Sequence, residues 1–182
     1  MFGGGLLCVV YGVLIERRWF RRRDYRLPVL PDTAAGPLTV LHLSDLHFVR
    51  DDPGKGRFLS SLPQPDVAVI TGDLLGEPEA VERVIEALRP IRGRVASYVV
   101  FGSNDYFAPR PLNYSNYFRR ERRIRRPRPN RPGDLLHLLE GDGWELLKNR
   151  RTGLDTHGVR FEVLVSGTSI CLWGRILRYR RT

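Results

Sequence analysis

Three short stretches of this 182-residue chain end an apolar run in side chains that could bind a metal ion. The stretch "LHLSDLHF" places Asp45 and His47 two positions apart, directly after an apolar segment. "VAVITGD" ends at Asp73, and "VVFGSND" ends at Asn104 and Asp105. Carboxylates and imidazoles are costly to bury without a partner. Carboxylate oxygens mixed with imidazole suit divalent ions such as Mn, Fe or Zn, so the pattern indicates a metal site.

The segments around these residues predict alternating strands and helices. The apolar runs at residues 38–44, 67–72 and 95–101 are typical of buried strands. Residues 57–62 predict a short helix, and residues 78–90 have the apolar spacing of a longer one. This order is that of an α/β unit with a parallel sheet. Because parallel strands end at the same edge of a sheet, where ligands bind, we expect the candidate ligands to converge there.

Glycines precede two of these candidate ligand positions. Gly72 stands directly before Asp73, and Gly102 stands before Ser103 and Asn104. Glycine allows a sharp turn or a close approach of the backbone. We therefore expect the backbone to turn sharply or to approach closely at both strand ends.

The blocks "SDLH", "TGD" and "GSND" resemble the D-x-H, G-D and G-N-H-[DE] motifs of the calcineurin-like metallophosphoesterases. The flanking "VLHLSDLH" and "VFGSNDYFAPRP" are similar to those of membrane-associated bacterial members. The resemblance implies an α/β fold, a β-sandwich flanked by helices, and hydrolysis of phosphoester bonds with two divalent metal ions. It implies that Asp45 and His47 bind the first ion, that Asp73 bridges both, and that Asn104 binds the second. A metal-activated hydroxide would attack phosphorus while the ions offset the phosphoryl charge.

Two features depart from the family pattern. Ser103 and Asn104 stand where the family has Asn and His, so either residue could be the ligand, and no histidine is present there to protonate the leaving group. The family's later G-H-x-H block is also missing, since we assign His42 to a strand, His137 to a structural or surface position on a helix, and His157 to an exposed turn. The sequence after residue 163 is not similar to the family. We therefore expect a domain incomplete at its C-terminal end, without the second sheet, and with weak or no activity.

Composition divides the chain into four regions. Residues 1–23, "MFGGGLLCVVYGVLI" and then "ERRWFRRR", predict a membrane-proximal anchor. The apolar stretch is shorter than the roughly 20 residues that a spanning helix needs. Its basic charge follows the apolar stretch, whereas in a signal peptide the basic charge precedes it. Residues 24–37 predict a Pro-rich linker, residues 38–165 the phosphoesterase-like domain, and residues 166–182 a basic tail.

The formal net charge of +10 favours anionic partners, although nearly all of the basic residues are arginine, a bias that genomic composition can also produce. The Arg-rich loop at residues 119–132 is typical of a solvated segment. Its stretch from Arg119 to Arg131, with aromatic neighbours, could instead contact phospholipid, and nucleic acid is the less favoured partner. The two cysteines, in unlike contexts, predict neither a disulfide framework nor a cysteine zinc site.

The resemblance to membrane-associated members implies a lipid-linked phosphate as the substrate. The N-terminal segment favours a membrane-associated location, with a cytoplasmic location otherwise. The alternative function is that of an inactive or truncated relative that acts as a basic module binding anionic lipid or nucleic acid. Metal content separates the two hypotheses, because the enzyme needs two divalent ions for each chain and the binding module needs none.

Overall fold

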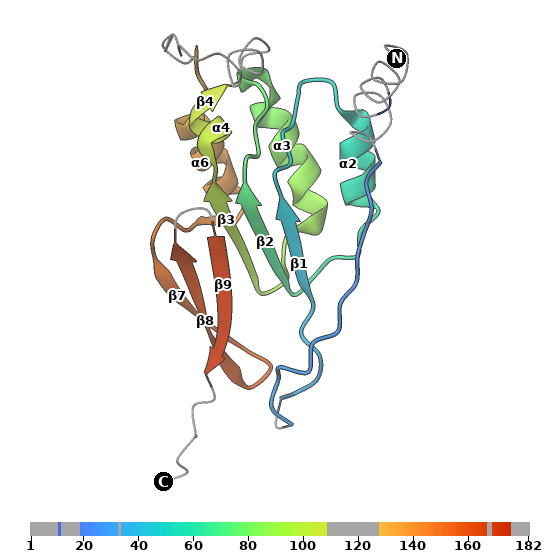
Figure 1. Cartoon of the computed structure of the whole chain (residues 1–182), viewed down its shortest axis with the longest axis vertical. Helices are drawn as coiled ribbons and strands as arrows, with labels where there is room; N and C mark the ends of the chain where they lie inside the picture. Colours follow the sequence, from blue (N-terminus) through green and yellow to red (C-terminus); the bar gives the residue numbers. More distant parts are fainter. Residues whose placement is uncertain (1–10, 12–18, 33, 109–127, 167–168, 176–182) are drawn as a thin grey trace, which may run out of the picture.

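The three apolar segments that precede the candidate ligands are neighbouring parallel strands of one sheet. The computed structural model describes residue 11 and residues 19–32, 34–108, 128–166 and 169–175. The strands are β1 (Val40–Ser44), β2 (Val67–Gly72), β3 (Ala96–Phe101) and β6 (Glu145–Leu146), in the order β1-β2-β3-β6. All of these neighbours pair in parallel, so β1, β2 and β3 end at one edge, as predicted (Figure 1).

Helices cover one face of this sheet (Figure 1). They are α2 (Pro53–Ser60), α3 (Val81–Leu88) and α6 (Pro132–Gly141). The short turns η2 (Pro78–Ala80) and η3 (Arg89–Ile91) flank α3, and α4 (Ser103–Tyr106) follows β3. The predicted longer helix is thus confirmed, and the predicted short one begins earlier, at Pro53, because Asp52 caps it.

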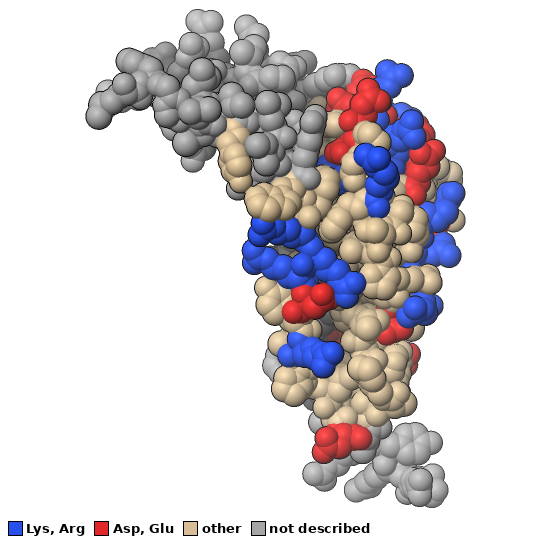
Figure 2. Space-filling model, turned by 90° about the vertical axis from the view of Figure 1, so that its right-hand side faces the viewer, with Lys and Arg blue, Asp and Glu red and all other residues tan. Residues whose placement is uncertain are grey.

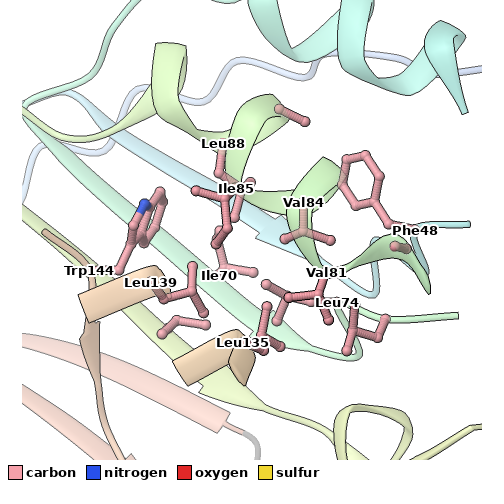
Figure 3. Close-up of a cluster of buried hydrophobic side chains, with 14 of the residues drawn as sticks. Phe48, Ile70, Leu74, Val81, Val84, Ile85, Leu88, Leu135, Leu139 and Trp144 are labelled. Carbon is pink, nitrogen blue, oxygen red and sulfur yellow. The ribbon is translucent and has the colours of Figure 1, made fainter. Parts of the chain in front are cut away.

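The core between helices and sheet is built from the apolar stripe of α3. Figure 3 shows Ile85 and Leu88 of α3 in the same buried cluster as Leu139 of α6 and Ile70 of β2. Burying one such side chain fully contributes about 1.5–3 kcal/mol. This packing anchors the sheet whose edge carries the candidate ligands.

A second sheet covers the other face of the parallel sheet (Figure 1). It is antiparallel, in the order β7 (Arg151–Thr156), β8 (Val159–Ser166), β9 (Ser169–Arg175). Phe161 and Val163 of β8 pack in one cluster with Val69 of β2 and Val100 of β3. The α/β sandwich is therefore confirmed, and the expectation that the second sheet is absent was wrong. The alternating apolar residues of β8 form the inner face of that sheet.

The edge strand β1 is covered less completely than its neighbours. Val40 pairs in register with Val67, so both side chains are on the face that the second sheet covers. Val67 is buried in this inter-sheet core, whereas Val40 is 43% exposed. The second sheet therefore packs chiefly on β2 and β3.

The N-terminal part of the chain contacts the domain through α2. Residues 19–32 form no helix or strand, and Phe20 stacks on Phe58 of α2 with ring centroids 5.4 Å apart. Among the described residues, no helix is long and apolar enough to cross a membrane. Residues 1–10 and 12–18 lie outside the described part, so the predicted anchor stays a prediction.

Most of the Arg-rich loop also lies outside the described residues, which resume at Arg128. There β5 (Arg128–Pro129) pairs antiparallel with β4 (Phe107–Ala108). Arg131 is engaged within the domain, since it forms ion pairs with Asp134 at 2.6 Å and with Glu82 at 3.3 Å. Phospholipid contact by the rest of this loop stays a prediction.

Candidate metal centre

Asp45, His47 and Asp73 converge at the carboxyl ends of β1 and β2. Each residue offers one ligand atom, and these three atoms lie within 4.8 Å of one another. His47 Nε2 is 3.8 Å from Asp73 Oδ2. Two carboxylates and an imidazole suit Zn or another divalent transition-metal ion, with ligand distances of about 2.0–2.2 Å. The three atoms are close enough to surround one such ion.

The loop after β1 is bent by two residues with positive φ. Asp45 has φ 51° and His47 has φ 43°. Few residues other than glycine adopt this region, although Asp and His do so more often than most. The N–H of Asp45 donates to the carbonyl of Thr71 at 3.1 Å, and the N–H of His47 donates to that of Asp73 at 2.9 Å. These bonds hold the bent loop against the end of β2.

Gly72 and Gly102 leave room for the two carboxylates. A Cβ at Gly72, whose φ is +82°, would overlap the carboxylate of Asp45. A Cβ at Gly102 would overlap the carboxylate of Asp73. The expectation of a close backbone approach is confirmed, because each carboxylate lies directly against glycine backbone. The two glycines therefore leave space for the carboxylates, which are oxygen ligands suited to a metal site.

Asn104 contacts this group of ligand atoms. Its N–H donates to Asp73 Oδ1 at 2.9 Å, and its Nδ2 lies 3.3 Å from His47 Nδ1. Rotating the side-chain amide of Asn104 by half a turn would place its oxygen, a possible metal ligand, where Nδ2 now lies. Ser103 lines a neighbouring cavity. Of the two alternatives for the third block, these contacts favour Asn104, and its role as a ligand stays a prediction.

Asp105 joins the loops that follow β2 and β3. It is fully buried, and its carboxylate accepts hydrogen bonds from the N–H groups of Leu74 (2.9 Å), Leu75 (2.8 Å) and Gly102 (2.9 Å). Burial raises the pKa of Asp105 to about 7, and the charge of Asp73 acts in the same direction, while these hydrogen bonds oppose the rise. Asp105 thus fixes both loops around Asp73. The sequence placed it only as the last residue of the third block.

The sequence does not predict two other polar side chains that lie near the candidate metal centre. The buried Asn130 donates from Nδ2 to the backbone carbonyl of Asn104 at 2.6 Å. Lys55 of α2 contacts the loop after β1. Neither residue belongs to a motif, and only the fold brings them to the site.

The other three histidines have different surroundings. His42 bonds to Thr71 Oγ1 at 2.8 Å across β1 and β2, and His137 is exposed on α6, as predicted for both. His157 lies in the turn between β7 and β8, with Nδ1 2.9 Å from Thr156 Oγ1. It is half-buried, so the prediction of an exposed side chain was wrong. This turn contacts the linker, since the N–H of Ala35 donates to the carbonyl of His157 at 3.0 Å.

A cavity of about 300 Å³ opens beside the candidate metal centre. Gly102 and Ser103 line the part next to Asp73, and Tyr106 and Leu147 add apolar wall. Lys148 also lines the cavity, and its Nζ lies 6.0 Å from the centroid of the Tyr106 ring. The cavity therefore combines apolar surface with a cation.

A family model described as calcineurin-like phosphoesterase matches residues 38–178. The chain belongs to the calcineurin-like phosphoesterase family. Comparison with curated proteins and with solved structures found no significant match. The family match continues past residue 163, so it includes part of the segment that we did not find similar to the family. Membership in the calcineurin-like phosphoesterases implies a metal-dependent hydrolase of phosphoester bonds, and Asp45, His47 and Asp73 form its candidate metal site.

Proposed function

We propose that this calcineurin-like phosphoesterase hydrolyses a phosphate ester or pyrophosphate at the centre formed by Asp45, His47 and Asp73. The observation that supports this most is the convergence of their three ligand atoms within 4.8 Å. The family match supports the reaction class. Asp73 and Asn104 are the candidate catalytic residues, because they connect the two strand ends where a phosphoryl group would lie.

The side chains that we assign provide more ligands for one metal ion than for a second. Asp45, His47 and Asp73 would hold the first ion, and Asp73 with Asn104 would contribute to the second. Bound Mn, Fe or Zn ions would activate water and offset negative charge on the phosphoryl oxygens. The chain holds its carboxylates in place for this task. Ser44 Oγ donates to Asp45 Oδ2 at 2.5 Å, and the N–H of Asn104 donates to Asp73.

Replacing Asp73 with Ala tests this proposal. We expect turnover of an aryl phosphate with Mn²⁺ to fall more than about 100-fold, because loss of a direct ligand should exceed the 10–100-fold effect of losing a supporting residue. Glu86→Ala is the matched control, since Glu86 is an exposed carboxylate of α3 paired with Arg83. Elemental analysis of both variants reports the metal content.

Equal turnover in the Asp73→Ala and unaltered chains would show that the activity arises elsewhere. If the unaltered chain held no divalent ion and yet bound anionic vesicles, a basic binding module would describe it better than an enzyme.

A lipid-linked phosphate is the substrate class that we favour. The cavity beside the centre supports an ester with an apolar organic group, since it offers Tyr106 and Leu147 next to Ser103. Lys148 adds a positive charge that would suit a second anionic group on the substrate. Such a substrate would lie at a membrane surface, where we propose that the protein acts.

A further inference from the structure

Lys55 is a buried lysine that reaches from α2 to the loop carrying Asp45 and His47. The residue is 9% exposed. Its ammonium donates to the backbone carbonyls of Leu46 and His47, the latter at 3.2 Å, and lies 2.8 Å from Asp52 Oδ2. An ammonium has three N–H donors, and these oxygens use all three. The cost of burying a charge is thereby offset by complete pairing.

Asp52 connects this lysine to the start of α2. Its Oδ1 accepts a hydrogen bond from the backbone N–H of Lys55 at 3.3 Å and so caps the helix. Its Oδ2 forms the ion pair with the ammonium. The ring of Phe48 lies beneath the ammonium, with its centroid 4.9 Å from Nζ. Helix, lysine and loop are therefore connected by short contacts on both sides of Lys55.

The two carbonyls that Lys55 binds belong to the peptide groups on either side of His47. The carbonyl of Leu46 lies in the peptide before His47, and the carbonyl of His47 lies in the peptide after it. His47 has φ 43°, so its backbone conformation is one that few side-chain-bearing residues adopt. Rotating either peptide would turn a carbonyl away from the ammonium. Lys55 thus fixes the backbone that directs the imidazole of His47.

The N–H groups of the same loop have separate partners. Those of His47 and Phe48 donate to the carbonyls of Asp73 and Leu74, at 2.9 and 2.7 Å. The loop is therefore held through these N–H groups by the segment that follows β2, and through the carbonyls of Leu46 and His47 by α2. The contacts with α2 come from one side chain, that of Lys55.

We propose that Lys55, held by Asp52, is a positioning residue that keeps His47 oriented for metal binding. The proposal rests on the proposed function in that His47 must be a ligand. Lys55 acts through the backbone of His47 and touches no reacting atom.

The test compares Lys55→Met with Lys55→Arg in the full chain. Met keeps an apolar stem without donors, and Arg keeps the charge and the donors. The readouts are the Co²⁺ dissociation constant from calorimetry and the Co²⁺ absorption spectrum, which reports the coordination geometry. We expect Lys55→Met to weaken Co²⁺ binding at least about tenfold, as is typical for supporting residues of metal sites, and Lys55→Arg to lie between it and the unaltered chain.

A second readout needs no metal. Amide hydrogen exchange at His47 and Phe48 should become faster in Lys55→Met, while exchange in β3 stays unchanged. Leu59→Ala is the matched control, because Leu59 is a buried apolar residue of the same helix. It should lower stability and leave the Co²⁺ affinity of the folded protein within about twofold of the original.

Unchanged Co²⁺ affinity and spectrum in Lys55→Met would overturn the proposal, as would an equal loss in Leu59→Ala. If Lys55→Met does not fold, Asp52→Asn replaces it, since Asn caps a helix as well as Asp but removes the charge that holds the ammonium. We expect this variant to weaken Co²⁺ binding about threefold, and unchanged binding would again overturn the proposal. A lack of Co²⁺ binding in the unaltered chain would instead contradict the proposed function, and amide exchange would still decide whether Lys55 holds the loop.

Discussion

At Gly102 a single added methyl group would meet both the carboxylate and the backbone nitrogen of Asp73. We therefore expect Gly102→Ala to displace Asp73 and to weaken Mn²⁺ binding at least about tenfold, as loss of a supporting group does. The same overlap should lower the free energy of unfolding by about 1–3 kcal/mol, as overpacking does. Calorimetric Mn²⁺ titration and urea unfolding measure the two effects.

Gly133 of α6 is the matched control for this change. A Cβ there meets nothing within 4 Å, so Gly133→Ala should leave Mn²⁺ binding unchanged and should not destabilise the helix. Unchanged Mn²⁺ affinity in Gly102→Ala would contradict the inference that close packing against Gly102 fixes the Asp73 carboxylate.

At the same scale, the sequence predicts some site residues and misses others for a physical reason. Asp45, His47 and Asp73 follow apolar strands directly, so strand direction alone brings them together. Lys55 and Asp105 act through hydrogen bonds to backbone groups of other segments, in the loop after β1 for Lys55 and in the loop after β2 for Asp105, and no local pattern encodes such partners. Asp52 with Lys55 three positions later was a weak signal, since it indicates a helix start but not what the lysine binds.

Among the elements, the beginnings of the parallel strands are joined by Asp66. Its Oδ2 accepts from the N–H (2.9 Å) and hydroxyl (2.5 Å) of Thr39, before β1, and its Oδ1 accepts from Arg94, before β3, at 3.1 Å. The Thr39 hydroxyl bond, with help from the Thr39 N–H and Arg94, lowers the pKa of Asp66 despite partial burial. The ionised carboxylate therefore holds β1 and β3 beside β2.

We expect Asp66→Asn to reduce the free energy of unfolding at pH 7 by about 1.5–3 kcal/mol, the range for hydrogen bonds to a charged group. Because the folded pKa is below the unfolded value, the contribution is complete above about pH 4 and is lost as the pH falls through the folded pKa. The difference between the two chains should thus shrink at pH 2–3. Urea unfolding at pH 7 and at pH 2.5 measures it.

Asp155→Asn provides the comparison, because Asp155 is an exposed carboxylate of β7 whose ion pair with Arg160 is long, at 3.5 Å. It should change stability by less than about 0.5 kcal/mol. A pH-independent deficit in Asp66→Asn would mean that the carboxylate's charge has no role.

The elements themselves differ in how far the sequence predicts them. β2 is buried at all six positions, and a continuous apolar run is a clear signal for such a strand. In the second sheet, β7 buries only Leu154 among its residues, so its sequence is too polar to indicate a core strand. Its stability comes from pairing with β8, which is a tertiary contact. The resemblance of the motif blocks does not extend to these strands, so it gives no indication of the second sheet.

At the scale of the whole molecule, the N-terminal segment exposes aromatic and apolar side chains on one side. Figure 2 faces this side and shows basic side chains in several groups with acidic ones between them. Trp19, Tyr25, Leu27 and Val29 are each more than half exposed, and the guanidinium of Arg21 lies 3.8 Å from the centroid of the Trp19 ring. Aromatic and apolar side chains beside arginine are the residues that anchor proteins at a lipid interface. They support the proposed membrane contact.

We expect the full chain to cosediment with vesicles of phosphatidylcholine and phosphatidylglycerol, and to do so more weakly as salt rises, since exposed charges are screened over about 10 Å at 0.1 M. Replacing Trp19, Leu27 and Val29 together with Ser should weaken this binding at least about fivefold, because burial of apolar surface contributes about 25 cal/mol per Å². Val95→Ser is the control, since Val95 is also exposed but precedes β3 at the opposite end of the sheet from the candidate centre.

A second variant separates this segment from the Arg-rich loop, which lies mainly outside the described residues. It replaces Arg122, Arg123, Arg125 and Arg126 with Ser, and each basic residue near an anionic surface is worth about 1 kcal/mol. If the loop contacts lipid, the arginine variant should lose most of the salt-dependent binding to vesicles. The N-terminal variant should bind vesicles more weakly at every salt concentration, and its binding should still depend on salt. Binding that is independent of salt and equal in both variants would contradict membrane contact by either segment. The arginines would then be a solvated surface, and the support that membrane contact gives to a lipid-linked substrate would be lost.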